Sequence, residues 1–210
     1  MPLTRRLSDA PQYNDAPARR RPSDAPQYDD APNAGNNIMG SAASCMGSKH
    51  AEITAGDVEV AQEAWAKGIV DIGKVYQEKG DYKAEAEKVI TDLYGSKEPG
   101  MEVLFKPTKA SEKAICHDYD GAVSYFVGAA AAGDIGLAED KGFAINPWTA
   151  VRFENSKTIL NADSATAMGE YFLTTLKGDV AKVEYTFQYQ RGADGALKIV
   201  VHHSSLPYSP

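Results

Sequence analysis

The sequence predicts an α+β domain in which a curved, mainly antiparallel sheet wraps round a long N-terminal helix and forms a cone. Residues 57–95 repeat apolar side chains at steps of three and four, as amphipathic helices do. Residues 148–205 contain long runs rich in β-branched and aromatic residues, separated by short turn segments. Helices followed by an antiparallel meander are typical of α+β domains.

The chain divides in composition near residue 50. Residues 1–50 hold six of the eleven prolines and few large apolar residues, which predicts a disordered tail. This tail contains a duplicated decamer, SDAPQYNDAP at 8–17 and SDAPQYDDAP at 23–32. We interpret the repeat as linker, and a docking motif present twice is the alternative. Residues 51–210 are predicted to form one domain.

The signals for membrane attachment are weak. Met39–Cys45, MGSAASC, would match a myristoylation signal if translation began at Met39, but Gly40 is internal here, so the stretch is interpreted as linker. No apolar run approaches the ~20 residues of a membrane span, and an apolar secretory segment is missing from the N-terminus. We expect a cytoplasmic protein, with a plastid or another organelle as the alternative.

Charge and cysteine content exclude several classes of partner. The net charge is −7, and residues 1–50 hold six basic and five acidic residues, so the acidic excess lies in the predicted domain. An acidic domain without a basic stripe argues against nucleic acid. The two cysteines, Cys45 and Cys116, are far apart, which indicates neither a disulfide framework nor a cysteine-rich zinc site.

The expected elements follow in chain order. Asp57 is the predicted N-cap of a first helix that Gly80 ends, and Asp81 the cap of a second. The segment 118–128 suits a helix or a strand, and we favour a short helix. The expected ranges are helices at 57–79 and 81–95, a short strand at 101–105, and strands at 148–160, 165–176, 180–190 and 197–205, with the last one central in the sheet.

The last strand carries two histidines and two serines. Because strand side chains alternate between faces, the residues on the predicted core face are Leu197, Ile199, Val201, His203 and Ser205. His202 and Ser204 then lie on the other face. A histidine and a serine beside an apolar interior need hydrogen-bond partners or a functional role.

Familiar catalytic motifs are missing from the sequence. Adjacent histidines on one strand point to opposite faces and cannot readily share a metal ion, and no HxH or HExxH spacing occurs. There is no G-x-S-x-G elbow and no glycine-rich phosphate loop. We therefore predict neither metal nor cofactor. Thr108 and Tyr125 are hydroxyl residues in apolar surroundings, and Tyr185 and Phe187 share one face of the neighbouring strand. The residues alone indicate a pocket without a particular reaction.

Several segments, in order, resemble the iota-class carbonic anhydrases. They are VLFKPT at 103–108, AVSYFVG at 122–128, GFAINPW at 142–148 with VRFEN at 151–155, KVEYTFQY at 182–189 and HHSSLPY at 202–208. That class is related in fold to the association domain of calcium/calmodulin-dependent kinase and to SnoaL-like and nuclear-transport-factor-like proteins. The resemblance implies a cone-shaped α+β fold, a homodimer, and reversible hydration of carbon dioxide to bicarbonate without metal.

The resemblance also implies site residues. It places Thr108, Tyr125, one histidine and one serine of HHSS around bicarbonate, without deciding between the neighbours. With the alternation argument, we assign catalytic roles to Thr108, Tyr125, His203 and Ser205. The residues assigned to substrate binding are His202, Ser204, Tyr185 and Phe187. The alternatives are an isomerase or cyclase of the same fold and a non-catalytic hub domain.

Overall fold

The computed structural model describes residues 52–209. The predicted tail with its repeat, and the stretch Met39–Cys45, lie outside the described residues. The helices are α1 (Ala55–Gln77), α2 (Tyr82–Leu93), α3 (Tyr119–Val127) and α4 (Ala129–Ala132), with 3₁₀ turns at Gly95–Lys97 and Gly133–Ile135. The strands are β1 (Leu104–Lys106), β2 (Trp148–Leu160), β3 (Ser164–Thr175), β4 (Val180–Arg191) and β5 (Leu197–Ser205).

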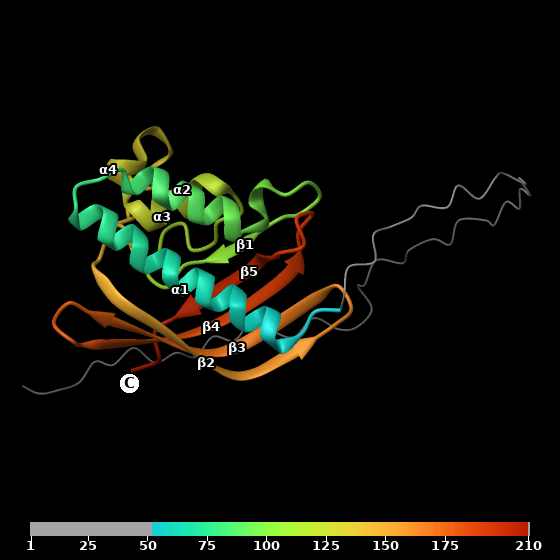
Figure 1. Ribbon diagram of the computed structural model, residues 1–210. Coiled ribbons are helices and arrows are strands. Elements are labelled where there is room, and N and C mark those ends of the chain that lie inside the picture. Colours follow the sequence, from blue (N-terminus) through green and yellow to red (C-terminus); the bar gives the residue numbers. More distant parts are fainter. Residues whose placement is uncertain (1–51, 210) are drawn as a thin grey trace, which may run out of the picture. The chain divides into compact units, whose positions relative to one another are not determined.

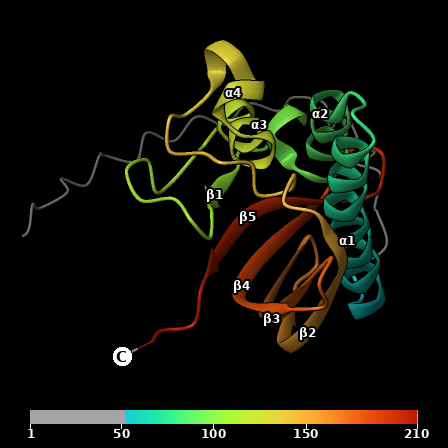
Figure 2. The ribbon, with the colours of Figure 1, turned by 90° about the vertical axis from the view of Figure 1, so that its left-hand side faces the viewer.

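The five strands form one curved sheet in the order β1-β5-β4-β3-β2. Strands β2 to β5 are an antiparallel meander, and β1 adds to β5 in parallel. The helices lie on one face of this sheet (Figure 1), and a view along the strands shows the sheet curving beneath them (Figure 2). The predicted α+β fold is confirmed. The sequence predicted the last strand at the centre of the sheet, but the middle strand is β4, and β5 lies between β1 and β4.

The N-cap of helix α1 lies three residues earlier than the sequence predicts. Thr54, not Asp57, is the N-cap: its hydroxyl accepts from the Asp57 amide, and the Asp57 carboxylate accepts from the Thr54 amide. This is a capping box, in which two otherwise unpaired amides are satisfied. The predicted apolar face of this helix is confirmed by Trp65, Ile69 and Ile72, which are fully buried.

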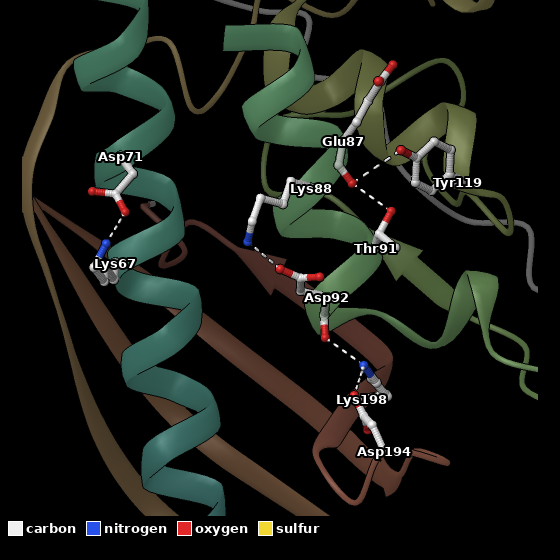
Figure 3. A network of polar contacts seen from close by, with 9 residues as sticks. All are labelled: Lys67, Asp71, Glu87, Lys88, Thr91, Asp92, Tyr119, Asp194 and Lys198. Carbon is white, nitrogen blue, oxygen red and sulfur yellow. Dashed lines mark hydrogen bonds and ion pairs between the residues drawn. The ribbon is translucent and has the colours of Figure 1, made fainter. Parts of the chain in front are cut away.

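Helix α2 is tied to its neighbours by the polar contacts in Figure 3. The Tyr119 hydroxyl of α3 donates to the carbonyl of Glu87, 3.2 Å away. From β5, the buried Lys198 ammonium donates to the carbonyl of Asp92 at 2.9 Å and to the Asp194 carboxylate at 3.0 Å. A cation at the last carbonyls of a helix is favourable. These contacts attach the start of β5 to the helix layer.

Strand β5 contains a β-bulge that reverses the predicted faces of its second half. Tyr189 pairs with Ile199 and Gln188 with Val201, so Val200 is an extra residue in the ladder. Alternation restarts after it, and His202, not His203, follows Ile199 onto the core side. His202 is 2% exposed, whereas His203 is exposed.

The core-face prediction was therefore wrong for Val201, His203 and Ser205. It stays correct for Leu197 and Ile199, which precede the bulge and are buried. The prediction that the two histidines point to opposite faces is confirmed by their opposite burial.

The core lies between the helices and the sheet and is rich in aromatic rings. Trp65 of α1 is at its centre, with ring centroids of Tyr171, Phe187 and His202 within 5.3, 5.7 and 5.6 Å. None of the helices within residues 52–209 is long and apolar enough to cross a membrane. The cytoplasmic location stays a prediction.

Candidate active site

Three hydroxyl groups from different parts of the chain meet at one end of this core. Lys106 of β1 pairs with His203 of β5, so Thr108, two residues further, comes beside the end of β5. Its hydroxyl lies 2.8 Å from that of Ser204 and 3.4 Å from that of Tyr171 on β3. Ser204 and Tyr171 are buried, and Thr108 is half-buried. The cluster therefore leads from the core towards the surface.

Tyr125 adds a fourth hydroxyl from α3. Asp118 caps this helix by accepting from the Gly121 amide at 2.7 Å. The Tyr125 ring is 6% exposed, and its hydroxyl has no hydrogen-bond partner among the described residues. Burial raises its pKa well above the usual value, although the nearby Thr108 hydroxyl and Lys109 amide act in the opposite sense. Tyr125 is thus a protonated phenol at neutral pH.

His202 lies in the same core, in a chain of hydrogen bonds with two residues of the helix layer. The Trp65 indole nitrogen donates to the Tyr94 hydroxyl at 2.9 Å, and that hydroxyl lies 2.8 Å from His202 Nδ1. Nε2 is buried and without a partner in the described part of the chain. Burial, with a smaller contribution from His203, holds the pKa of His202 well below its usual value, so the ring is neutral at pH 7.

Aromatic rings link these polar groups. The centroid of the Phe105 ring lies 4.7 Å from that of the His202 ring and 5.5 Å from that of the Tyr125 ring. Phe187, a predicted substrate-binding residue, is 4.2 Å from His202. A cavity of about 260 Å³ opens beside Tyr125 and is also lined by Lys109, Asp140, Lys141, Phe143 and Trp148. Aromatic rings thus surround His202 and Tyr125, and Tyr125 also borders a small opening.

The predicted site residues fall into two groups. Thr108, Tyr125, His202, Ser204 and Phe187 share the core. Tyr185 contacts Phe187, with ring centroids 5.0 Å apart, but its hydroxyl pairs with Gln62 and Asn155. His203 and Ser205 lie apart from this core, and they line a groove of about 580 Å³ with Glu154, Met168, Glu184 and Thr186.

Sequence reasoning missed three residues that contact the site. Tyr171 lies between Ala167 and Leu173 in the buried alternation of β3, so its face could have been read from the sequence. Tyr94 and Trp65 carry no such signal, because their partners lie 108 and 29 residues away in the chain. Within residues 52–209, no three His, Cys, Asp or Glu side chains converge in a way that could hold a metal ion.

Comparisons with known proteins agree with this geometry. Residues 56–206 match the sequence profile of the family described as metal-independent carbonic anhydrase. The chain belongs to this family. A metal-independent carbonic anhydrase from Nostoc sp. is 41% identical over 159 residues, which are 74% of this chain and 75% of the relative.

Solved structures extend the comparison. The crystal structure of an iota-carbonic anhydrase from a cyanobacterium, complexed with bicarbonate, is 40% identical with a TM-score of 0.70, over 76% of this chain and 95% of that one. A calcium/calmodulin-dependent kinase II association domain from Xanthomonas campestris is 21% identical with a TM-score of 0.47, over 75% and 91%. The resemblance read from the sequence is confirmed, and it favours a carbonic anhydrase over an isomerase, a cyclase or a hub.

Proposed function

We propose that this chain hydrates carbon dioxide reversibly to bicarbonate in the aromatic core between α3, β1 and β5. One observation carries the location: Tyr125 and His202 each leave a buried polar atom without a partner among the described residues, in the core that also holds the hydroxyls of Thr108 and Ser204. Buried polar groups are almost always paired. A small anion with three oxygens would supply the missing acceptors, and bicarbonate is bound in the related cyanobacterial structure.

The chemistry requires stabilisation of charge on oxygen. When water attacks carbon dioxide, a new C–O bond forms, one C=O electron pair moves onto oxygen, and one water proton leaves. Donors that are already oriented in a dry site stabilise that developing charge without reorganisation. Tyr125 suits this role because burial keeps it protonated. Apolar walls admit carbon dioxide, and they strengthen each hydrogen bond to the product.

The released proton needs a path out of the core. A hydroxyl group can accept one proton while it donates another. We propose that the proton passes from water through Ser204 to Thr108, whose oxygens are 2.8 Å apart, and then to solvent at the half-buried Thr108. His203 and Ser205, which the sequence assigned to catalysis, are left out of this proposal because they line the separate groove.

Paired serine variants test the location. In stopped-flow hydration assays on protein freed of metal by chelation, Ser204→Ala should lower kcat/KM by about 10²-fold, because it removes the first group of this proton path. Ser205→Ala makes the same change one residue along and should leave kcat/KM near that of the parent. A larger loss of kcat/KM in Ser205→Ala than in Ser204→Ala would contradict the proposed location of the site. Activity that disappears on chelation and returns with zinc would contradict the metal-free mechanism.

We also propose that a second copy of the chain covers the face of the sheet that carries His203. Apolar residues on that face remain exposed, namely Leu104, Ile159 and Met168. Opposite residues of paired strands share a face, and the register pairs Leu104 with Val201, Ile159 with Thr166 and Lys157 with Met168. Exposed apolar side chains on an open sheet face favour a homodimer interface.

A further inference from the structure

The hydrogen-bond chain from Trp65 through Tyr94 to His202 decides which nitrogen of His202 carries the proton. We infer that Tyr94 and Trp65 are positioning residues that hold His202 in the neutral tautomer with hydrogen on Nε2. His202 then donates from Nε2 to a substrate oxygen and does not accept the proton that hydration releases. The assignment of the tautomer rests on contacts in the core, and the role towards substrate rests on the proposed function.

The chain begins at a group that can only donate. An indole nitrogen carries one hydrogen and has no acceptor lone pair. The 2.9 Å contact between Trp65 Nε1 and the Tyr94 hydroxyl therefore makes the Tyr94 oxygen an acceptor. Both side chains are fully buried, so neither exchanges this bond for one with bulk water.

The Tyr94 hydroxyl must then place its own hydrogen. Burial raises the pKa of Tyr94 far above neutrality, so the hydrogen stays on the phenol. The acceptor in contact with it is His202 Nδ1, at 2.8 Å. If Nδ1 instead carried hydrogen, the phenol hydrogen would lose this acceptor, whereas Nε2 has no partner among the described residues in either tautomer. A buried donor without an acceptor lowers stability, so the arrangement in which the Tyr94 hydroxyl donates to Nδ1 is the stable one.

A neutral imidazole carries one hydrogen, and an accepting Nδ1 leaves it on Nε2. This N–H lies in the core without a partner among residues 52–209. The rings of Phe105 and Phe187, 4.7 and 4.2 Å away, pack against the imidazole and hold its orientation. A fixed N–H in an apolar setting is suited to an oxyanion and unsuited to a proton acceptor. The hydration proton must then leave by another group, in agreement with the hydroxyl path through Ser204.

The tautomer can be measured without substrate. In full-length protein with ¹⁵N-labelled histidine, long-range ¹H–¹⁵N spectra distinguish a protonated ring nitrogen from a bare one. Signals of His202 are assigned with His202→Gln and His203→Gln. We expect a protonated Nε2 and a bare Nδ1 in His202 at neutral pH. A protonated Nδ1, a charged ring or an even mixture of tautomers would overturn the inference.

Tyr94→Phe tests whether the positioning matters. It removes the donor to Nδ1 with little change in volume, so the tautomers should mix and kcat should fall about tenfold or more. Tyr189→Phe is the matched control, because this core tyrosine is fully buried and its hydroxyl has no partner in the described chain. It should leave the tautomer and kcat unchanged.

The two measurements separate the two proposals. A fixed Nε2–H tautomer in a wild-type protein that does not hydrate carbon dioxide would contradict the proposed function and keep the positioning role. A lower kcat in Tyr94→Phe with an unchanged tautomer would show a packing effect and overturn the inference. If Tyr94→Phe does not fold, the wild-type spectrum decides.

Discussion

Two side chains distinguish the candidate site, because each buries a polar atom that has no hydrogen-bond partner among the described residues. The Tyr125 hydroxyl and His202 Nε2 are buried, and neither pairs with another group in residues 52–209. Such groups lower the stability of the free protein, since burial removes water that is not replaced. A bound anion would restore the missing bonds. Stability and activity should therefore respond in opposite directions when these groups are removed.

Tyr125→Phe is the direct test of that opposition. It removes one hydroxyl without leaving another group unpaired, so the free energy of unfolding should stay the same or rise by up to ~1 kcal/mol. In contrast, kcat/KM should fall by about 10²-fold. Urea unfolding and stopped-flow hydration measure the two quantities.

Tyr119→Phe is the control for this test. The Tyr119 hydroxyl donates to the Glu87 carbonyl in the network of Figure 3, which includes none of the core hydroxyls. Its loss should lower the unfolding free energy by ~0.5–1.5 kcal/mol and leave activity intact. Full activity in Tyr125→Phe would remove Tyr125 from the site.

His202 should also make the protein sensitive to acid. Its pKa is depressed in the folded state by burial, so below about pH 6.5 the unfolded chain binds a proton that the folded chain does not. The stability is fully present above pH 6.5 and decreases by up to ~1.4 kcal/mol per pH unit as the pH falls towards the folded pKa.

Replacing the ring tests this dependence. In urea unfolding at several pH values below neutrality, His202→Phe should show a shallower loss of stability than the parent. His203→Gln removes the exposed neighbour and should keep most of the slope, since burial is the main cause of the shift. An unchanged slope in His202→Phe would show that other groups cause the acid sensitivity.

Packing between the elements depends on close approaches that the sequence does not reveal. Helices α1 and α2 meet at Gly68, where an added Cβ would lie 2.7 Å from a methyl carbon of Val89. Only glycine fits without displacing that β-branched side chain. The contact sets how closely α2 lies to α1, and through Tyr94, which follows α2, it bears on the position of His202.

Gly68→Ala should therefore destabilise the domain. The gain in helix propensity of up to ~1 kcal/mol is outweighed by overpacking, which costs about 1–3 kcal/mol. Gly56→Ala is the matched control in the same helix, because its Cβ would meet nothing closer than the Thr54 hydroxyl at 3.7 Å. It should leave stability unchanged or raise it in thermal unfolding. A Gly68→Ala variant as stable as Gly56→Ala would contradict the close contact.

The domain as a whole uses the two faces of its sheet differently. The inner face holds the aromatic core and the hydroxyl cluster, and the outer face carries exposed apolar residues and the groove that His203 lines. This division makes the two proposals independent, since catalysis is assigned to the inner face and dimer formation to the outer.

Met168→Glu tests the proposed dimer. Met168 is 56% exposed on the outer face, and a charge there would have to be buried without a partner in a symmetric interface. Light scattering at micromolar concentration should show a dimer for the parent and a monomer for the variant. Val60→Glu is the control: Val60 is 66% exposed on α1, and its replacement should keep the dimer. A monomeric parent would contradict the proposal.

The order and type of the elements could be read from the sequence. Period-3.6 and period-2 apolar patterns depend on neighbours along the chain, and they predicted α1, α2 and all four long strands within a few residues of their observed bounds. The hydroxyl residues Thr108 and Tyr125 could also be proposed for the site from the sequence, because each is a polar residue within an apolar motif.

The tertiary structure alone decided which half of HHSS enters the core. The bulge at Val200 arises from the pairing of β5 with β4, which no property of β5 in isolation specifies, and one extra residue moves His202 and Ser204 inward. The partners of His202 were equally hidden, because Tyr94 and Trp65 reach it only when the helix layer packs on the sheet. Local periodicity fixes what a segment becomes, whereas register and packing between distant segments fix which side chains meet.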